Sequence, residues 1–504
     1  MSQPTPVTPI DAPPAGVADR LGTVRVAVDD DLARRLADAC DSVSVLDDDR
    51  AEAGRDWWPL AIGWAAAGAV PSRPALVARP TDTAQVAAVL ALCDTAGVPV
   101  TPAGGRSGVC GASIPLFGGV ALDLCGLAGI GDVDDVSLVA DLRAGTFGPD
   151  VEAGLRGGHG LTLGHWPQSM DLSTVGGWLA CRGAGQYSNR YGKIEDMVLG
   201  LEVVLADGRI IRTGGTGPRS ATGPDLTQLF VGSEGTLGVI TEGRFRVHPV
   251  PGGEGRRSVG FATFAEGLDA CRRILRRGAS PAVLRLYDAT ESGRNFDEPD
   301  TNVLIVLDES DPALLDATLS VVDQECAGAS ALDVALVDRW LSHRNDVSAL
   351  APLWRSGVVV DTVEVSARWA SLPGLYAAVL DALGGVPGTL VASSHQSHAY
   401  TDGACLYFTF AGRPPEELEP DRRDAWVGDY YRRAWDEVTR ATIHAGGAIS
   451  HHHGIGLNRG RFLADGLGGA FDVLAAVKHA LDPRGILNPG KLGLPSPFGP
   501  VPWP

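Results

Sequence analysis

Six of the eleven histidines of the sequence lie between residues 395 and 453, and five of these lie in two short segments. His395 and His398 lie in the first, and the run His451-His452-His453 lies in the second, just before the turn 454–456. Imidazole titrates near neutral pH and also ligates metals, so these side chains could act as general acids and bases or hold an ion. Taken alone, a packed or solvated triplet explains the same pattern.

Two polar residues interrupt apolar segments that alternate like strands. Tyr407 lies in the segment 404–410, and Arg285 lies in the segment 283–288. Burying an unpaired guanidinium is costly, so Arg285 is expected to meet an anion, either Asp288 or a ligand. Tyr407 by itself is more typical of a core than of a catalytic site.

Three glycine-rich segments, 102–111, 171–177 and 232–240, lie in the first half of the chain. Consecutive backbone N–H groups with a hydroxyl beside them can wrap a pyrophosphate without lysine. None of the three is a GxGxxG or Walker loop, so neither an ordinary Rossmann site nor a P-loop is indicated. One such segment could be a tight turn alone, but three together favour a dinucleotide site.

The charge of the chain limits its partners. Lys plus Arg number 42 against 61 Asp plus Glu, a formal charge of −19, which argues against nucleic acid and anionic membranes and leaves a small-molecule substrate. Eight cysteines without a CxxC pair predict free, mostly buried thiols. No run of 18 apolar residues occurs and the amino end lacks signal-peptide features, so we expect no integral membrane segment and a cytoplasmic protein.

The elements that must position these residues follow from periodicity and turn residues. Residues 31–56 have helical spacing, and the Pro- and Gly-rich segment 249–255 marks a boundary. The pattern predicts helices at 84–96, 264–277, 372–383 and 471–481, and strands at 75–79, 98–101, 120–124, 136–142, 199–205, 238–247, 282–288 and 301–308.

Five segments resemble the alkyldihydroxyacetonephosphate synthases of the vanillyl-alcohol-oxidase superfamily. They are 165–178, 191–196, 222–225, 232–242 and 450–456, and the resemblance extends from about residue 74 to 492. It implies an α+β fold: a two-subdomain FAD-binding domain of the PCMH type, an α+β cap domain with an antiparallel sheet, and a C-terminal segment returning to the FAD domain. Composition and helical spacing predict a disordered tail (1–20) and a helical segment (21–73). The resemblance implies that the FAD domain (74–252), the cap (253–440) and the C-terminal segment (441–504) follow.

The resemblance also implies which residues hold FAD. The expected residues are Pro102, Gly104, Gly105, Arg106, Ser107, Val109, Gly111, Met170, Asp171, Ser173, Thr174, Gly176, Gly177, Arg182, Gly183, Gly185, Glu234, Gly235, Gly238, Ile240 and Asn488. Many relatives bind the flavin covalently through a histidine in the first loop. Residues 102–111 contain none, so non-covalent FAD is expected.

By the same resemblance, Tyr407 and His451–His453 form the catalytic face and Arg285 holds the substrate anion. In the synthases, flavin N5 exchanges acyl for alkoxide on acyl-dihydroxyacetone phosphate without net oxidation. A second phosphate-binding arginine is expected before the Tyr407 strand, and His395 stands near its place. That departure weighs against a phosphate-bearing substrate, and His395 becomes a further candidate for the site. A homodimer is a further expectation.

The alternative is a flavin-dependent dehydrogenase of D-lactate or D-2-hydroxyglutarate type. Those enzymes carry Gly-Glu-His-Gly-Ile-Gly where this chain has His451–Gly456, and some bind a divalent metal there with a His-x6-His pair. Here His398 is present, and Tyr407 is interpreted as standing in the place of the second histidine. We predict no metal. A flavin-binding protein without catalysis is a third hypothesis.

Overall fold

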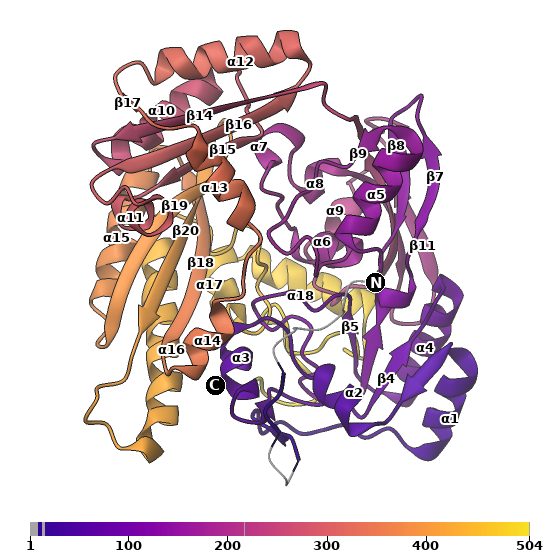
Figure 1. Cartoon of the computed structure of the whole chain (residues 1–504). Helices are drawn as coiled ribbons and strands as arrows, with labels where there is room; N and C mark the ends of the chain where they lie inside the picture. The colour runs from indigo at the N-terminus through magenta and orange to yellow at the C-terminus, as the bar shows by residue number, and fades with distance from the viewer. Residues whose placement is uncertain (1–8, 13–15, 216, 503–504) are drawn as a thin grey trace.

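Two α+β units lie side by side in the computed structural model, which describes residues 9–12, 16–215 and 217–502 (Figure 1). The first unit runs from indigo to magenta in the figure, and the second, red to orange, is built on one large sheet. The yellow C-terminal segment crosses back beneath the first unit. The predicted α+β class is confirmed.

The first unit begins with a small, mostly parallel sheet. Its strands, in order across the sheet, are β2 (Ser42–Ser44), β4 (Leu76–Arg79), β6 (Val120–Asp123) and β5 (Val100–Ala103). Helix α4 (Thr83–Ala96) connects β4 to β5. Its first turn is capped by Asp82, which accepts the Gln85 N–H at 2.8 Å, and it ends at Gly97 in the left-handed conformation. Those two residues delimit the helix that the sequence predicted.

The second sheet of this unit is antiparallel and has five strands. In order they are β11 (Ile210–Gly214), β10 (Val198–Val204), β12 (Val239–Arg246), β8 (Val139–Arg143) and β7 (Ile130–Asp134). The strand predicted at 136–142 is confirmed over residues 139–142, which belong to β8, but it begins three residues too early, because residues 136–138 form the turn that follows β7. The Asp134 carboxylate accepts the N–H groups of Val136 and Ser137, and Val136 is exposed at the tip. The helices of this part of the chain are α5 (Gly148–His159), α6 (Val175–Cys181), α7 (Ser188–Tyr191), α8 (Ile194–Met197) and α9 (Thr227–Phe230).

The second unit is an antiparallel sheet of seven strands with helices packed against it. The strand order is β17 (Ser330–Ala331), β14 (Gly253–Phe261), β16 (Asn302–Ser310), β15 (Val283–Tyr287), β19 (Thr389–Ala399), β20 (Gly403–Gly412) and β18 (Val359–Arg368). Its helices are α10 (Phe264–Arg276), α11 (Ala289–Phe296), α12 (Pro312–Glu325), α13 (Ala335–His343), α14 (Leu350–Arg355) and α15 (Leu372–Gly384).

The C-terminal segment joins the two units. After the long helix α16 (Pro420–His444) come η2 (Gly460–Phe462), α17 (Leu463–Leu467) and α18 (Ala470–Leu481). The chain then reaches the first sheet, where Leu487 bridges Val100 in parallel and Lys491 Nζ donates to the Ile114 carbonyl at 2.7 Å. The segment thus completes the first unit as well as the cavity described below.

The amino end is partly ordered. Ala18–Asp19 form strand β1, which pairs with β3 (Ala69–Val70), so the last residues of the predicted tail belong to the fold. Residues 1–8 and 13–15 of that tail lie outside the described residues. The segment 21–73 contains the helices α1 (Asp30–Ala39), α2 (Asp47–Glu52) and α3 (Pro59–Ala65). Over the described part of the chain, no helix is both long and apolar enough to cross a bilayer.

Candidate active site

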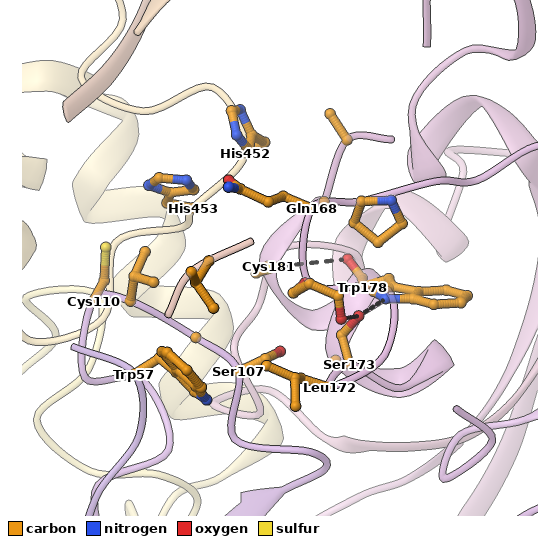
Figure 2. Close-up of a pocket in the computed structure, with 18 of the residues that line it drawn as sticks. Trp57, Ser107, Cys110, Gln168, Leu172, Ser173, Trp178, Cys181, His452 and His453 are labelled. Carbon is orange, nitrogen blue, oxygen red and sulfur yellow. Dashed lines mark hydrogen bonds between the residues drawn. The ribbon is translucent and has the colours of Figure 1, made fainter. Parts of the chain in front are cut away.

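A cavity of about 760 Å³ lies where the two units and the C-terminal segment meet. Figure 2 shows His452 and His453 on one side of it and Ser173 and Trp178 on the other. The first unit lines it with glycine-rich loops, and the second with strands of its sheet and helix α13. A site of this size and position suits a cofactor together with a substrate.

The first two glycine-rich loops pass so close together that a side chain would separate them. A Cβ on Gly105 would lie 2.0 Å from the Leu172 carbonyl oxygen, and one on Gly104 would lie 2.2 Å from Thr174 Oγ1. Glycine is therefore required for the contact, and the loops form one continuous wall of the cavity. The sequence indicated the loops but not that they touch.

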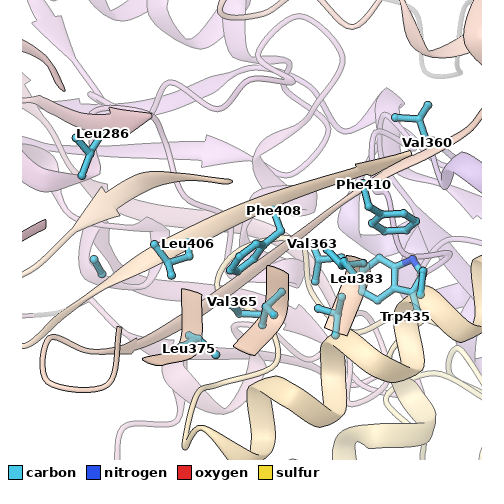
Figure 3. Packing of buried hydrophobic residues seen from close by; sticks show 14 of the residues in the cluster. Leu286, Val360, Val363, Val365, Leu375, Leu383, Leu406, Phe408, Phe410 and Trp435 are labelled. Carbon is cyan, nitrogen blue, oxygen red and sulfur yellow. The ribbon is translucent and has the colours of Figure 1, made fainter. Parts of the chain in front are cut away.

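Tyr407 reaches the cavity because successive side chains of strand β20 point to opposite faces of the sheet. Tyr407 and Thr409 line the cavity, whereas Leu406, Phe408 and Phe410 are fully buried on the opposite face of the sheet. Figure 3 shows those three residues packed in the core with Val363 of β18, Leu375 of α15 and Trp435 of α16. This packing fixes the strand that carries the tyrosine.

Arg285 is held by a chain of hydrogen bonds that ends on a buried carboxylate. Its Nη2 lies 2.6 Å from His395 Nε2, and His395 Nδ1 lies 2.7 Å from Glu291 Oε2. Arginine only donates, so Nε2 accepts and the proton of His395 is on Nδ1. Burial lowers the pKa of His395, consistent with a neutral ring. Asp288, the other anion expected for Arg285, instead caps α11.

Glu291 remains ionised despite its burial. Burial opposes its charge, but the contacts with His395, Arg294 and Thr409 outweigh that effect and lower the pKa of Glu291 to about 2. Its oxygens accept hydrogen bonds from Ser393, Thr409 and His395 and pair with Arg294. Glu291 is thus fully engaged and leaves Arg285 free to meet a ligand.

The histidine run forms a tight turn clamped by two buried carboxylates. Glu364 Oε1 accepts the backbone N–H groups of His451, His452 and His453 at 3.2, 2.9 and 2.6 Å. Glu234 Oε1 accepts the N–H of Ile455 at 2.6 Å and Glu234 Oε2 that of Gly456 at 2.8 Å. These contacts fix the histidine backbone relative to both units.

The charge of Glu364 is balanced by Arg459, which is fully buried beside it. Burial raises the pKa of Glu364, but the Arg459 charge and the hydrogen bonds outweigh this and hold it well below the usual range. At Gly456, which has φ of +53°, a Cβ would lie 2.1 Å from the Cys110 carbonyl oxygen, so the turn also rests on the first loop.

The predicted catalytic residues do not all face the cavity. Arg285, His395, Tyr407, His452 and His453 line it. His451 does not, and its Nε2 lies 3.0 Å from the Tyr400 hydroxyl.

Four metal-capable side chains come together at the turn, and two of them, His398 and His452, also line the cavity. His398, Cys405, His451 and His452 have ligand atoms within 4.8 Å of one another. The residue of β20 paired with His398 is Cys405, so the interpretation that Tyr407 takes the place of a second histidine is wrong. The prediction that no metal binds stays a prediction. All eight cysteines are free, as expected.

Comparison with known proteins identifies the family. The FAD binding domain matches residues 74–214, and the C-terminal domain of FAD linked oxidases matches residues 256–492. The FAD-linked oxidoreductase YgcU of Escherichia coli O157:H7 is 30% identical over 83% of this chain and 89% of its own length. The chain belongs to the FAD-linked oxidases of the vanillyl-alcohol-oxidase superfamily. FAD is its cofactor.

Other relatives of this flavoenzyme differ in their activities. Alkyldihydroxyacetonephosphate synthase of Dictyostelium discoideum is 29% identical over 84% of this chain and 74% of its own, and glycolate oxidase subunit GlcD of Bacillus subtilis is 29% identical over 84% and 89%. A solved alkyldihydroxyacetonephosphate synthase superposes with a TM-score of 0.74 at 25% identity over 95% of this chain and 88% of that chain. p-Cresol methylhydroxylase, at 18% identity and a TM-score of 0.73 over 94% and 99%, shares the fold.

The cavity offers donors that suit the pyrophosphate of FAD. Arg106 is buried at the wall of the cavity, and its Nε and Nη2 have no hydrogen-bond partner among the described residues. The buried Thr174 Oγ1 likewise has no hydrogen-bond partner among the described residues. Buried donors of this kind are rare unless a ligand completes them. The residues present therefore fit the cofactor.

Most of the residues predicted to bind FAD line this cavity, with six exceptions. These are Gly111, Met170, Asp171, Arg182, Gly185 and Asn488. Asp171 and Arg182 are exposed, and Asn488 Nδ2 donates to the carbonyls of Ala112 and Glu234. We infer a scaffolding role for Asn488, and contact with FAD stays a prediction for these six.

Sequence reasoning missed Glu364 and Glu291, and it did not single out Arg344, which lines the cavity. Glu364 had a visible signal, since it is a charge between Val363 and Val365 in an apolar run, the same signal that singled out Arg285. Glu291 and Arg344 lie in polar helical or loop surroundings that carried no such signal.

Purified protein is expected to be yellow and to release its flavin on acid precipitation. The first loop contains no histidine, and burial raises the pKa of both Cys110 and Cys181, which keeps these thiols protonated and weakly nucleophilic. The absorbance of supernatant and pellet measures this. Flavin that remains in the pellet would contradict non-covalent binding.

Proposed function

We propose that this flavoenzyme acts on a small organic or lipid-like anion, with chemistry like that of the alkyldihydroxyacetonephosphate synthases. The observation that carries the proposal is Arg285. It lines the cavity beside Tyr407 and the histidine turn, and no carboxylate of the described residues pairs with it. An oriented guanidinium without a counter-ion suits a carboxylate or phosphate of the substrate.

The cofactor and two residues near Arg285 supply the other groups that the reaction needs. Bound FAD supplies, at N5, an atom that can exchange a substituent or accept a hydride. Burial raises the pKa of Tyr407, whose hydroxyl lies 3.0 Å from Thr362 Oγ1, so it keeps its proton and can donate a hydrogen bond. Burial lowers the pKa of His453 to about 4, so its ring is neutral and can accept a proton.

The protonation state of His453 predicts how kcat depends on pH on the acidic side. A histidine that accepts a proton must be neutral, and a pKa near 4 keeps it neutral through the physiological range. We expect kcat to be flat between about pH 5 and 8 and to fall below pH 5. Steady-state rates across this range test it. A fall centred near the ordinary histidine value of about 6.5 would remove His453 from the role.

A dehydrogenase of 2-hydroxy acids is the second candidate, favoured by the cluster of His398, Cys405, His451 and His452. Burial lowers the pKa values of its three histidines well below normal, which leaves their nitrogens free to ligate. GlcD, a glycolate oxidase subunit by name, is among the relatives. Stoichiometric zinc or manganese in metal analysis of the purified protein would support this candidate.

Two assays on the same preparation separate the candidates. In the first, the holoenzyme is mixed anaerobically with D-2-hydroxy acids and flavin absorbance is followed. In the second, exchange of a fatty alcohol into acyl-dihydroxyacetone phosphate is measured. Exchange without bleaching is the expected result. Bleaching by a hydroxy acid without exchange would reject the synthase-like function in favour of the dehydrogenase.

A further inference from the structure

The C-terminal segment (yellow in Figure 1) contacts two of the three glycine-rich loops that line the cavity. The first loop (102–111) and the third (232–240) are far apart in the sequence, and both contribute to the cavity wall. They also touch each other, because a Cβ on Gly235 would lie 2.4 Å from Pro102 Cγ. The position of one loop relative to the other therefore helps to set the shape of the cavity.

The segment first supports strand β5, from which the first loop starts. β5 is the edge strand of its sheet, and Leu487 bridges Val100 of that strand in parallel. The Val100 N–H donates to the Ile486 carbonyl at 2.8 Å, and the Val100 carbonyl accepts the Asn488 N–H at 2.8 Å. Buried backbone groups at a sheet edge need such partners, so the segment fixes the start of the first loop.

Asn488 bridges the two loops with one side-chain amide. Its Nδ2 donates to the carbonyl of Ala112, directly after the first loop, at 2.9 Å, and to the carbonyl of Glu234 in the third loop at 2.7 Å. The residue is 1% exposed, and its backbone has φ of +41°, in the left-handed region that asparagine tolerates better than most residues. A buried amide with both N–H groups engaged opposes movement of either loop.

Two buried lysines of the segment add one contact near each loop. Lys478 Nζ donates to the Thr236 carbonyl of the third loop at 2.7 Å and forms an ion pair with Asp482. Lys491 Nζ donates to the carbonyl of Ile114, just beyond the first loop, at 2.7 Å. Desolvating an ammonium group is costly, so both side chains depend on these contacts for their buried positions.

Lys491 also lies in the field of two buried carboxylates. Burial lowers the pKa of Lys491 to about 7, while the charges of Glu234 in the third loop and Asp56 before α3 oppose that fall. Burial raises the pKa of Asp56 to about 7, and Lys491 is among the groups that oppose the rise. Each charge is therefore stabilised by the others, which links Lys491 to the third loop and to the chain before α3.

We infer that residues 478–491 form a clasp that holds the first and third loops in their FAD-binding positions, with Asn488, Lys478 and Lys491 as positioning residues for the cofactor. The inference depends on FAD being the cofactor and not on the proposed substrate. Arg106, whose buried Nε and Nη2 have no partner among the described residues, belongs to the first loop. A loop released from the clasp would carry this donor away from FAD, so loss of the clasp should speed FAD release.

The test compares FAD release from the wild-type holoenzyme and from Asn488→Gly. Glycine tolerates the left-handed backbone at this position, so the change removes only the bridging amide. Each yellow holoenzyme is diluted, and the rise of flavin fluorescence gives the rate at which FAD leaves. Asn488→Gly should release FAD about ten-fold faster or more, because two buried hydrogen bonds are lost. Far-UV circular dichroism should show that the secondary structure remains while FAD leaves.

The matched control is Asn302→Ala in β16 of the second unit. Asn302 Nδ2 is buried and also donates to two backbone carbonyls, those of Phe261 and Ala262, but the residue is not part of the cavity wall. This variant should have a lower melting temperature and release FAD at the wild-type rate. Release from Asn488→Gly at the wild-type rate, equal acceleration in the control, or release that only accompanies loss of secondary structure would overturn the inference.

Lys491→Met tests the clasp at a second position, should Asn488→Gly fail to fold. Methionine has a similar length and no donor, so the contact with Ile114 is lost and FAD release should be several-fold faster. The double variant Lys491→Met, Asp56→Asn also removes a carboxylate that the lysine had stabilised. It should release FAD as fast as Lys491→Met, because the contact with Ile114 is still missing. A return to the wild-type rate would assign FAD retention to the charge of Asp56 and overturn the role of Lys491 in the clasp.

Discussion

Arg285→Gln is expected to lower kcat/KM by about 100-fold or more while FAD stays bound. Glutamine removes the charge that faces the substrate anion, and losing one partner of a desolvated ion pair costs about 2–5 kcal/mol. The side chain does not hold the glycine-rich loops, and its hydrogen bonds go to His395 and Tyr287 within the second unit. Steady-state kinetics and the flavin-to-protein absorbance ratio measure the two effects.

The control for this change is Arg339→Gln, which removes an arginine from the cavity wall that already has a counter-ion. It should retain kcat/KM within a few-fold. If Arg285→Gln instead released the flavin, Arg285 would belong to the scaffold and not to the substrate site. A variant at the orienting residue, His395→Ala, should raise KM more than it lowers kcat, because Arg285 would remain but lose its fixed position.

Glu364→Gln is expected to lower both stability and turnover. Arg459 would be left as a buried, unpaired charge, at a cost of about 3–5 kcal/mol. The backbone N–H groups of the three histidines would lose their ionised acceptor, and a shift of about 1 Å in the turn should reduce kcat about 100-fold. Chemical denaturation of the holoenzyme and kcat measurements test these effects.

The double variant Glu364→Gln, Arg459→Met separates the two effects. It removes the unpaired charge, so most of the stability should return, while kcat should stay low because the turn still lacks its carboxylate. The surface variant Glu254→Gln, at an exposed pair with Arg256, should change stability by less than about 1 kcal/mol. Full recovery of kcat in the double variant would show that Glu364 acts only through stability.

Helices and strands could be predicted from the sequence wherever the apolar periodicity agrees with the residues that typically begin or end such elements. Helix α4 is an example, since Asp82 and Gly97 mark its two ends. The β7–β8 hairpin was missed because its turn depends on one side chain, Asp134, whose carboxylate accepts the N–H groups of Val136 and Ser137. Such a contact is not visible in hydrophobic alternation.

The site was predictable in its residue types but not in its contacts. Arg285 and Glu364 could be recognised as charges within apolar strands, because burying a charge requires a partner. The place of Arg344 at the cavity wall could not, because two of its three aromatic neighbours, Trp166 and Tyr187, come from a distant part of the chain and meet it only in the folded state. The pairing of His398 with Cys405 likewise depends on a register shift between β19 and β20.

The central claim is the proposal that the site beside the flavin binds an organic anion through Arg285. Its most direct test is an anaerobic titration of the purified yellow protein. The titrants are acyl-dihydroxyacetone phosphate, a D-2-hydroxy acid and the uncharged 4-ethylphenol, with flavin absorbance as the readout. We predict that an anion perturbs or bleaches the flavin spectrum, that 4-ethylphenol does not, and that Arg285→Gln abolishes the response to the anion. A response to the uncharged phenol alone, or an anion response unchanged in Arg285→Gln, would contradict the account.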